Sequence, residues 1–210
     1  MSASLKHKTV RGVTWSFVDN IANQGITFLV GLVLARLLSP EEYGLIGIIM
    51  IFIAVFNSIV DSGFSNALIR KNDATNIDYN TVFITNLLLS VVLFLILFAC
   101  APSIGRFFNK LELVPLTRVM GCILIINAFA IIQRTLLVKR VDFKTQTKVS
   151  LIASVSSGVI GVCMAFAGLG VWSLVGQQVS RQLLNACFLW YYAKWLPAVQ
   201  FSRSEEHTSE

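Results

Sequence analysis

Six long runs of apolar residues constrain the fold of this chain more than any other feature of its sequence. A helix needs about 20 mainly apolar residues to cross the hydrocarbon core of a bilayer. Runs of roughly that length occupy residues 13–34, 44–68, 82–100, 119–137, 149–169 and 171–193. Only 13% of the residues are charged and 55% are hydrophobic, whereas about 25% are charged in a typical soluble domain. The sequence therefore predicts an all-α polytopic membrane protein, a bundle of six spanning helices.

Two of the connections between these runs have a recognisable local chemistry. Ser39, Pro40 and Glu42 have the spacing of a capping box, with serine at the N-cap, proline at N1 and glutamate at N3. The second helix is therefore expected to begin near Pro40. Only the tripeptide Gly168-Leu169-Gly170 separates the last two runs. Because glycine permits backbone conformations that other residues avoid, this spacing predicts a tight antiparallel helical hairpin.

The distribution of Lys and Arg predicts the orientation, since these residues gather on the cytoplasmic side of membrane proteins. With a cytoplasmic N-terminus, the cytoplasmic segments hold Lys6, Lys8, Arg11, Arg70, Lys71, Arg134, Lys139, Arg140, Lys144, Lys148 and Lys194. The opposite side then holds only Arg36, Arg106, Lys110 and Arg118. We therefore expect both ends of the six-helix region to be cytoplasmic. The net charge of +6 is explained by this bias, and no basic recognition element for nucleic acid is present.

Residues 134–148 combine this positive charge with apolar side chains such as Leu137, Val141 and Phe143. Such a pattern predicts an amphipathic helix on the cytoplasmic surface, with its basic side toward anionic headgroups. The alternative is an ordinary helix end followed by a basic membrane anchor.

The two ends of the chain have different interpretations. The basic start runs into an apolar stretch without a cleavage site followed by a soluble domain, so we interpret it as a retained first helix rather than a signal peptide. Residues 203–210 (RSEEHTSE) change character abruptly and resemble the translation of a sequencing adapter. On that interpretation residues 1–202 form the native membrane region and the natural chain continues. The alternative is an ordinary polar tail.

Four stretches together resemble the polysaccharide transporter family, the Wzx-like oligosaccharide flippases of the MATE-like flippase superfamily. They are residues 12–15 (GVTW), 35–44 (ARLLSPEEYG), 61–71 (DSGFSNALIRK) and 170–177 (GVWSLVGQ). Members of this family have two pseudo-symmetric helical lobes facing a central cavity. The resemblance covers only the first lobe, so it implies that this six-helix bundle is one lobe of a two-lobed transporter.

The resemblance also implies a function. We expect alternating-access flipping of an undecaprenyl-pyrophosphate-linked oligosaccharide across a bacterial inner membrane, for polysaccharide or lipopolysaccharide biosynthesis. Its implied partners are the lipid-linked oligosaccharide, membrane lipids, and the polysaccharide polymerase and other glycan-assembly proteins. Two alternatives remain open, namely an ion-coupled drug or small-molecule antiporter on the same fold, and a membrane scaffold of glycan assembly that does not transport.

Ionisable residues inside a membrane span are costly and mark functional sites by default. Arg181 lies midway along the sixth run, and Gln177 and Asn185 flank it at four-residue spacing, so the three side chains share one helix face. A guanidinium binds phosphate oxygens in a bidentate manner, so this stripe is a candidate site for a pyrophosphate. The alternative is that Arg181 pairs with a carboxylate to hold helices together.

The first run carries Asp19 and Asn23, again four residues apart, which predicts that this helix also lines the cavity. Asp19 is either the partner of Arg181 or a site of proton or sodium coupling. Asp61 and Arg11 are secondary candidates near the cytoplasmic ends of their helices. Single amides are more often contacts between helices than substrate ligands.

Nothing in the sequence indicates an enzyme, because the zinc-protease, serine-hydrolase and P-loop patterns are all missing. The four cysteines form no CxxC pair and lie inside or beside apolar runs. We expect no metal and no cofactor, and we expect Ser and Thr in the helices to bond to their own backbone.

Overall fold

Six long helices make up the described part of the chain, which contains no strand. The computed structural model describes residues 2–60, 68–69, 75–140, 142–193 and 195, without the side chains of residues 2–13 and 16. The helices are α1 (Ser2–Leu37), α2 (Pro40–Val60), α4 (Asn76–Phe107), α5 (Leu113–Lys139), α6 (Phe143–Phe166) and α7 (Val171–Ala193). The prediction of an all-α fold is confirmed.

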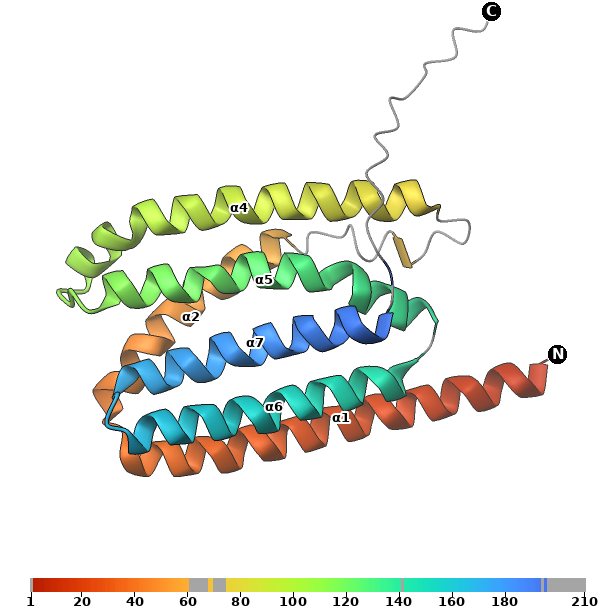
Figure 1. Cartoon of the computed structure of the whole chain (residues 1–210), viewed down its shortest axis with the longest axis horizontal. Helices are drawn as coiled ribbons and strands as arrows, with labels where there is room; N and C mark the ends of the chain where they lie inside the picture. The colour runs from red at the N-terminus through yellow and green to blue at the C-terminus, as the bar shows by residue number, and fades with distance from the viewer. Residues whose placement is uncertain (1, 61–67, 70–74, 141, 194, 196–210) are drawn as a thin grey trace, which may run out of the picture.

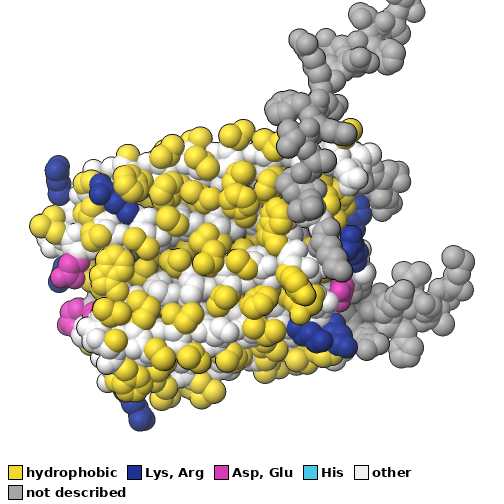
Figure 2. All heavy atoms as spheres, viewed as in Figure 1, with side chains coloured by type: hydrophobic (Ala, Val, Ile, Leu, Met, Phe, Trp, Pro, Cys, Tyr) yellow, Lys and Arg dark blue, Asp and Glu magenta, His cyan; other side chains and the backbone are white. Residues whose placement is uncertain are grey.

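Five of these helices are long and apolar enough, by length and composition, to cross a membrane. They provide the spans Phe17–Leu37, Pro40–Val60, Asn76–Phe107, Leu113–Lys139 and Phe143–Phe166. α7 is not among them, because amides and Arg181 interrupt its apolar sequence. Hydrophobic side chains cover the middle of the bundle face in Figure 2, whereas Lys and Arg gather at its two ends. This arrangement is that of a polytopic membrane bundle, and the crossing of the sixth helix stays a prediction.

The helices pack side by side in an order that differs from their order in the sequence. α4 packs on α5, α5 on α7, α7 on α6, and α6 on α1, while α2 crosses behind α5 and α7 (Figure 1). The largest cluster of buried apolar side chains joins α2, α4 and α5, with Ile49, Leu97 and Met120 almost fully buried in it, and includes the last part of α1 and the start of α7. Apart from this end, α1 packs mainly on α6. α1 therefore lies at one edge of the bundle.

The predicted connections are present. Ser39 N donates to Glu42 Oε2 at 2.7 Å, and Glu42 N donates to Ser39 Oγ at 3.4 Å, which completes the capping box at the start of α2. Gly168 and Gly170 adopt positive φ angles of 76° and 54° in the turn between α6 and α7. A Cβ on Gly170 would lie 2.5 Å from Glu42 Oε1, so the two connections also pack against each other.

Several helices extend beyond the apolar runs that predict them, because capped polar turns continue them. α4 begins six residues before its run, where Thr75 N donates to Asp78 Oδ2 at 2.9 Å and Asp78 N donates to Thr75 Oγ1 at 3.4 Å. Residues 61–67 of the second predicted run lie outside the described residues.

The predicted amphipathic helix over residues 134–148 does not form as one element. α5 continues to Lys139 and α6 begins at Phe143, where Asp142 accepts from Thr145 N at 3.2 Å as an N-cap. The cap ends one helix and starts the next, so the basic side chains are divided between two helix ends, as in the alternative interpretation. Contact of this region with headgroups stays a prediction.

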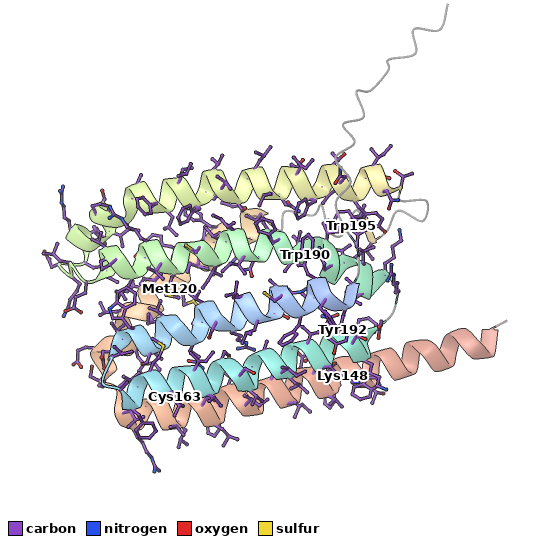
Figure 3. All side chains as sticks on the ribbon, in the orientation of Figure 1. Met120, Lys148, Cys163, Trp190, Tyr192 and Trp195 are labelled. Carbon is purple, nitrogen blue, oxygen red and sulfur yellow. The ribbon has the colours of Figure 1, made fainter. Side chains whose placement is uncertain are left out.

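Aromatic side chains gather at the end of the bundle where α1 begins. Trp190, Tyr192 and Trp195 lie toward this end in Figure 3, and Trp190 Nε1 donates to the carbonyl of Phe129 at 2.9 Å. Phe83 packs against both tryptophans, with ring centroids 6.3 and 6.1 Å apart. Tryptophan and tyrosine are enriched at membrane–water interfaces, so this cluster suits the end of a membrane bundle.

Candidate functional site

The polar face of α7 is the most unusual surface of the bundle. Gln177, Gln178, Arg181, Gln182 and Asn185 recur along it at helical spacing, and all five are half-buried. α7 packs between α5 and α6 and also touches α2, so this face opens toward the space between those helices and α1.

Arg181 borders two neighbouring pockets. One, of about 180 Å³, is lined by Arg134, Ser150, Ala153, Gln178, Arg181, Gln182 and Asn185. The other, of about 270 Å³, is lined by Thr27, Gly31, Leu34, Tyr43, Ile46, Gly47, Met50, Leu174, Gln177, Gln178 and Arg181. The three residues of the predicted stripe therefore lie around the same two pockets. Asn185 lines the first pocket with Arg181, and Gln177 lines the second with it.

Arg181 makes only long contacts to its neighbours on α1. Its Nη2 donates to Asn23 Oδ1 at 3.4 Å and its Nη1 donates to Thr27 Oγ1 at 3.5 Å. These distances are beyond the usual range of about 2.7–3.2 Å. The guanidinium therefore has donors to offer to a ligand in either pocket.

A network of short hydrogen bonds joins α1 to α6 beside Arg181. Asn23 Nδ2 donates to Asp19 Oδ1 at 2.5 Å and to Ser150 Oγ at 2.7 Å, and Ser154 Oγ donates to Asn23 Oδ1 at 2.5 Å. Asn23 uses both ends of its amide, so it fixes the two helices relative to each other. We call Asp19, Asn23, Ser150 and Ser154 the polar seam.

The structure brings Asp19 and Arg181 near each other without a direct ion pair between these two described side chains. Asn23 connects them, because it donates to the carboxylate and accepts from the guanidinium. Asp19 is also attracted electrostatically by Arg134 and by Arg181. Among the described side chains, two guanidinium groups and one carboxylate share this region, so their net charge is positive.

The structure does not describe the side chains of the two secondary candidates, Asp61 and Arg11. Asp61 lies outside the described residues, and Arg11 lies on α1 with its side chain outside them. Asn57, one turn before Asp61, accepts a hydrogen bond from Asn127 Nδ2 at 3.1 Å. That contact between α2 and α5 is structural.

Sequence reasoning missed three residues of the site. The hydroxyls of Ser150 and Ser154 bind Asn23 across the helix interface, contrary to the expectation that helical serines bond to their own backbone. Arg134 lines the pocket of Arg181 as well as beginning the basic segment of residues 134–148. The detectable signal was the four-residue spacing of Ser150, Ser154 and Gly158 on α6, a pattern of small residues at a close helix contact.

Among the described residues, no group of three or more His, Cys, Asp or Glu side chains could hold a metal ion.

Comparison with known proteins identifies the family. The family model described as "Polysaccharide biosynthesis protein" matches residues 33–208. The chain belongs to the polysaccharide biosynthesis protein family. The match includes α2 to α7, and so includes Arg181 and the polar face of α7, while only the end of α1 lies within it.

Curated relatives of this polysaccharide biosynthesis protein carry related names. It is 28% identical over 96% of its length to the succinoglycan biosynthesis transport protein ExoT of Rhizobium meliloti. It is 23% identical over 95% of its length to the lipopolysaccharide biosynthesis protein WzxC of Escherichia coli, and 27% identical over 94% to the teichuronic acid biosynthesis protein TuaB of Bacillus subtilis. The chain spans 41% of the length of each. No solved structure matches.

Proposed function

We propose that this chain forms the first lobe of a flippase that moves an undecaprenyl-pyrophosphate-linked oligosaccharide across a bacterial inner membrane. Family membership and the relative named as a transport protein support a role in polysaccharide export. The relatives are more than twice as long, which is compatible with a second lobe that faces the polar side of α7.

The observation that carries this proposal is the cationic pocket around Arg181. A charged residue in a membrane bundle is costly and is retained where it faces a polar cavity or a ligand. Arg181 faces two pockets, and Arg134 lines one of them. Guanidinium groups bind phosphate oxygens as forks with two parallel hydrogen bonds. A pyrophosphate is the part of a lipid-linked oligosaccharide that this chemistry suits.

The mechanism we propose is alternating access. The polar face of α7 and the polar seam form one wall of a central cavity, and the second lobe supplies the other wall, as in transporters built from repeats. The amides along α7 give the glycan–pyrophosphate head a hydrogen-bonding surface. The prenyl chain remains in contact with apolar surroundings while the head crosses.

One feature favours a second candidate function, an ion-coupled antiporter. Asp19 lies within the described membrane region and beside two arginines, and an intramembrane carboxylate is a common proton site. The antiporter predicts that Asp19→Asn abolishes transport driven by an ion gradient. A flippase that uses only the cationic pocket predicts that this variant still restores surface glycan.

Complementation tests the proposal. The complete reading frame, recovered from the source DNA, is expressed in a host that lacks its own flippase and accumulates lipid-linked glycan inside. We compare the wild type with Arg181→Ala and Arg181→Lys, and with Arg106→Ala as a matched control at the end of α4, outside the pockets. Membrane insertion is measured for every variant.

Restored surface glycan with the wild type and Arg106→Ala, but not with Arg181→Ala, supports flipping through a cationic pocket. Restored surface glycan with Arg181→Ala would show that flipping does not need Arg181. Failure of the wild type in several hosts with different glycans, despite normal insertion, would favour the antiporter or a membrane scaffold. Weak activity of Arg181→Lys is expected, because an ammonium keeps the charge but loses the fork geometry.

A further inference from the structure

A third pocket adjoins the two pockets of Arg181. It has a volume of about 160 Å³ and lies where α2, α5 and α7 meet, with the amides of Asn57, Gln178 and Gln182 in its lining. Gln178 lines all three pockets, and Gln182 also lines the pocket that Arg134 shares with Arg181. The three pockets are therefore neighbours on the polar face of α7, and we call the third one the amide pocket.

The amide pocket differs from its neighbours in charge. Arg181 lines both of the other pockets and Arg134 lines one of them, whereas no described residue that lines the amide pocket is charged. A cationic compartment and a neutral polar one thus lie side by side. A ligand that occupies both would have an anionic part joined to an uncharged polar part.

The amides of this pocket have hydrogen-bonding capacity to offer. The side chains of Gln178 and Gln182 make no hydrogen bond within the described part of the chain. Asn57 Oδ1 accepts from Asn127 Nδ2 at 3.1 Å, and this bond leaves the NH₂ group of Asn57 as a donor. Since a glutamine amide has two donor hydrogens and an acceptor oxygen, the pocket suits ligand groups that both donate and accept, as hydroxyl groups do.

Apolar side chains form the rest of the amide pocket. Ile53 and Ile123 line it and are buried in the main apolar cluster, so this wall is held in place by the core. Apolar walls with a few placed polar groups are usual for small-molecule sites. A sugar ring has the same combination, with C–H groups on its faces and hydroxyls at its edge. The pocket is smaller than the usual range of about 300–1,000 Å³, which suits one sugar ring rather than a longer glycan.

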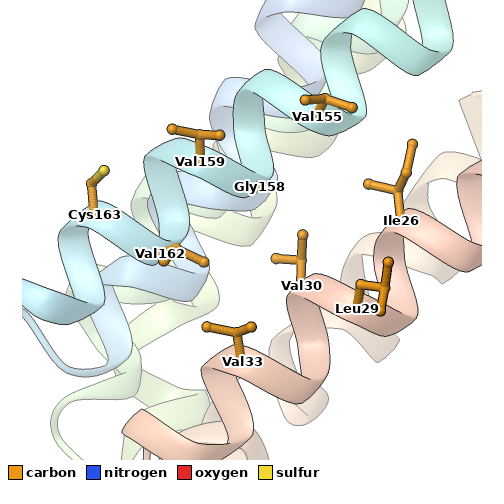
Figure 4. A pocket seen from close by; sticks show the side chains of 9 residues that line it. All are labelled: Ile26, Leu29, Val30, Val33, Val155, Gly158, Val159, Val162 and Cys163. Carbon is orange, nitrogen blue, oxygen red and sulfur yellow. The ribbon is translucent and has the colours of Figure 1, made fainter.

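The apolar groove between α1 and α6 in Figure 4 is a separate cavity. Its volume is about 350 Å³, and none of the residues that line it lines the amide pocket or either pocket of Arg181. Its lining is almost entirely aliphatic and lacks amides and hydroxyls. The groove is therefore no part of the proposed site, and it provides a control position.

We propose that the amide pocket binds the sugar ring that is joined directly to the diphosphate of the lipid-linked oligosaccharide. This inference rests on the proposed function for the identity of the lipid. A diphosphate at Arg181 and Arg134 lies beside Gln178 and Gln182, because both glutamines line that pocket too. The first sugar then enters the amide pocket, where the glutamines and Asn57 bind its hydroxyls. This contact makes binding selective for the first sugar.

Affinities for a series of short-chain analogues test the inference. The protein, expressed from the complete reading frame, is placed in phosphatidylethanolamine–phosphatidylglycerol nanodiscs. Its affinity is measured for farnesyl diphosphate and for farnesyl diphosphates that carry one glucose, galactose, N-acetylglucosamine or N-acetylgalactosamine ring. The readout is the ratio of the two affinities, which isolates the contribution of the sugar.

Two variants change the amide pocket and two are controls. Ala54→Phe fills the pocket, because Ala54 lines it and neither pocket of Arg181. Gln182→Met keeps an unbranched side chain and removes one amide. Val55→Phe adds the same ring at the next residue of α2, which is exposed and lines none of the three pockets. Val159→Phe adds it in the separate groove of Figure 4.

We expect at least one sugar to raise the affinity about tenfold or more, because each neutral hydrogen bond contributes a factor of about 2–12. Ala54→Phe should abolish this increase, and Gln182→Met should reduce it by about one such factor. Val55→Phe and Val159→Phe should retain it. The proposal is overturned if none of these sugars raises the affinity, or if the increase is unchanged in Gln182→Met or in correctly inserted Ala54→Phe.

Arg181→Ala separates this inference from the proposed function. Farnesyl diphosphate binding that depends on Arg181 but does not increase with any sugar would support the diphosphate site and overturn the sugar site. A sugar-dependent increase that Ala54→Phe abolishes, together with affinities that Arg181→Ala leaves unchanged, would support the sugar site and show that the diphosphate does not bind at Arg181.

Discussion

Asn23 is the residue whose removal most directly tests the packing of α1 against α6. Its amide makes 2.5–2.7 Å hydrogen bonds to Asp19, Ser150 and Ser154, and it also accepts from Arg181 at 3.4 Å. Asn23→Leu keeps a side chain that branches at Cγ and removes all of these bonds. It also leaves the Asp19 carboxylate without its amide donor.

The expected cost follows from the number and kind of bonds. Hydrogen bonds between membrane helices contribute on average about 0.6 kcal/mol and at most about 1.7 kcal/mol each, and Asn23 makes two to α6. A hydrogen bond to a charged group contributes about 1.5–3 kcal/mol, and the bond to Asp19 is of this kind. Asn23→Leu should therefore lower the free energy of unfolding by about 3–6 kcal/mol.

The assay is reversible unfolding in bicelles, measured for Asn23→Leu, Ser154→Ala and the double variant. The double-mutant cycle should give a coupling free energy of about 0.6–1.7 kcal/mol between Asn23 and Ser154. Gln24→Leu is the control, because Gln24 is the next residue of α1 and is exposed, and its effect should stay within about 0.5 kcal/mol. A coupling within about 0.3 kcal/mol of zero would refute the reasoning, since the two side chains would then not share a hydrogen bond.

Three other predictions concern the packing, the capping and the orientation of the helices. Gly158→Leu should lower the free energy of unfolding by about 1–3 kcal/mol through overpacking against Val30, and Val30→Ala in the same chain should recover part of it. Glu42→Ala should cost about 0.5–2 kcal/mol by opening the capping box, whereas Glu41→Ala, at an exposed neighbouring position, should cost much less in the same unfolding assay. A cysteine placed at the exposed Asn109 between α4 and α5 should react with a membrane-impermeant maleimide added outside the cell, and reaction only after permeabilisation would contradict the predicted orientation.

The sequence predicts the helices and one face of the site well, because both depend on local spacing. Residues four apart on a helix share a face whatever surrounds them, so Gln177, Arg181 and Asn185 could be grouped in advance. The capping box of Ser39 and Glu42 depends on three neighbouring residues and could be predicted for the same reason. The length of the apolar runs likewise indicates a membrane protein.

Contacts between helices far apart in the sequence could not be predicted in this way. Ser150 and Ser154 are unremarkable in a helix until α1 is known to lie against α6, 127 or more residues away. Arg134 had an adequate explanation as a positive residue at a helix end, so nothing in its own neighbourhood assigned it to the pocket of Arg181. The break in the predicted amphipathic segment depends on a single residue, Asp142, whose carboxylate caps α6.

The environment of Arg181 supports the proposed binding role over a purely structural one. A charged residue at the centre of a membrane helix costs about 2.5–3.5 kcal/mol, and a structural arginine offsets this cost with a close carboxylate. Here the described contacts of Arg181 to α1 are long, at 3.4 and 3.5 Å, and Asp19 is held by Asn23 instead. The guanidinium thus keeps much of its hydrogen-bonding capacity next to two pockets. On the function proposed here, an anionic ligand supplies the missing oxygens and offsets the cost when bound, whereas a scaffold would have no such ligand.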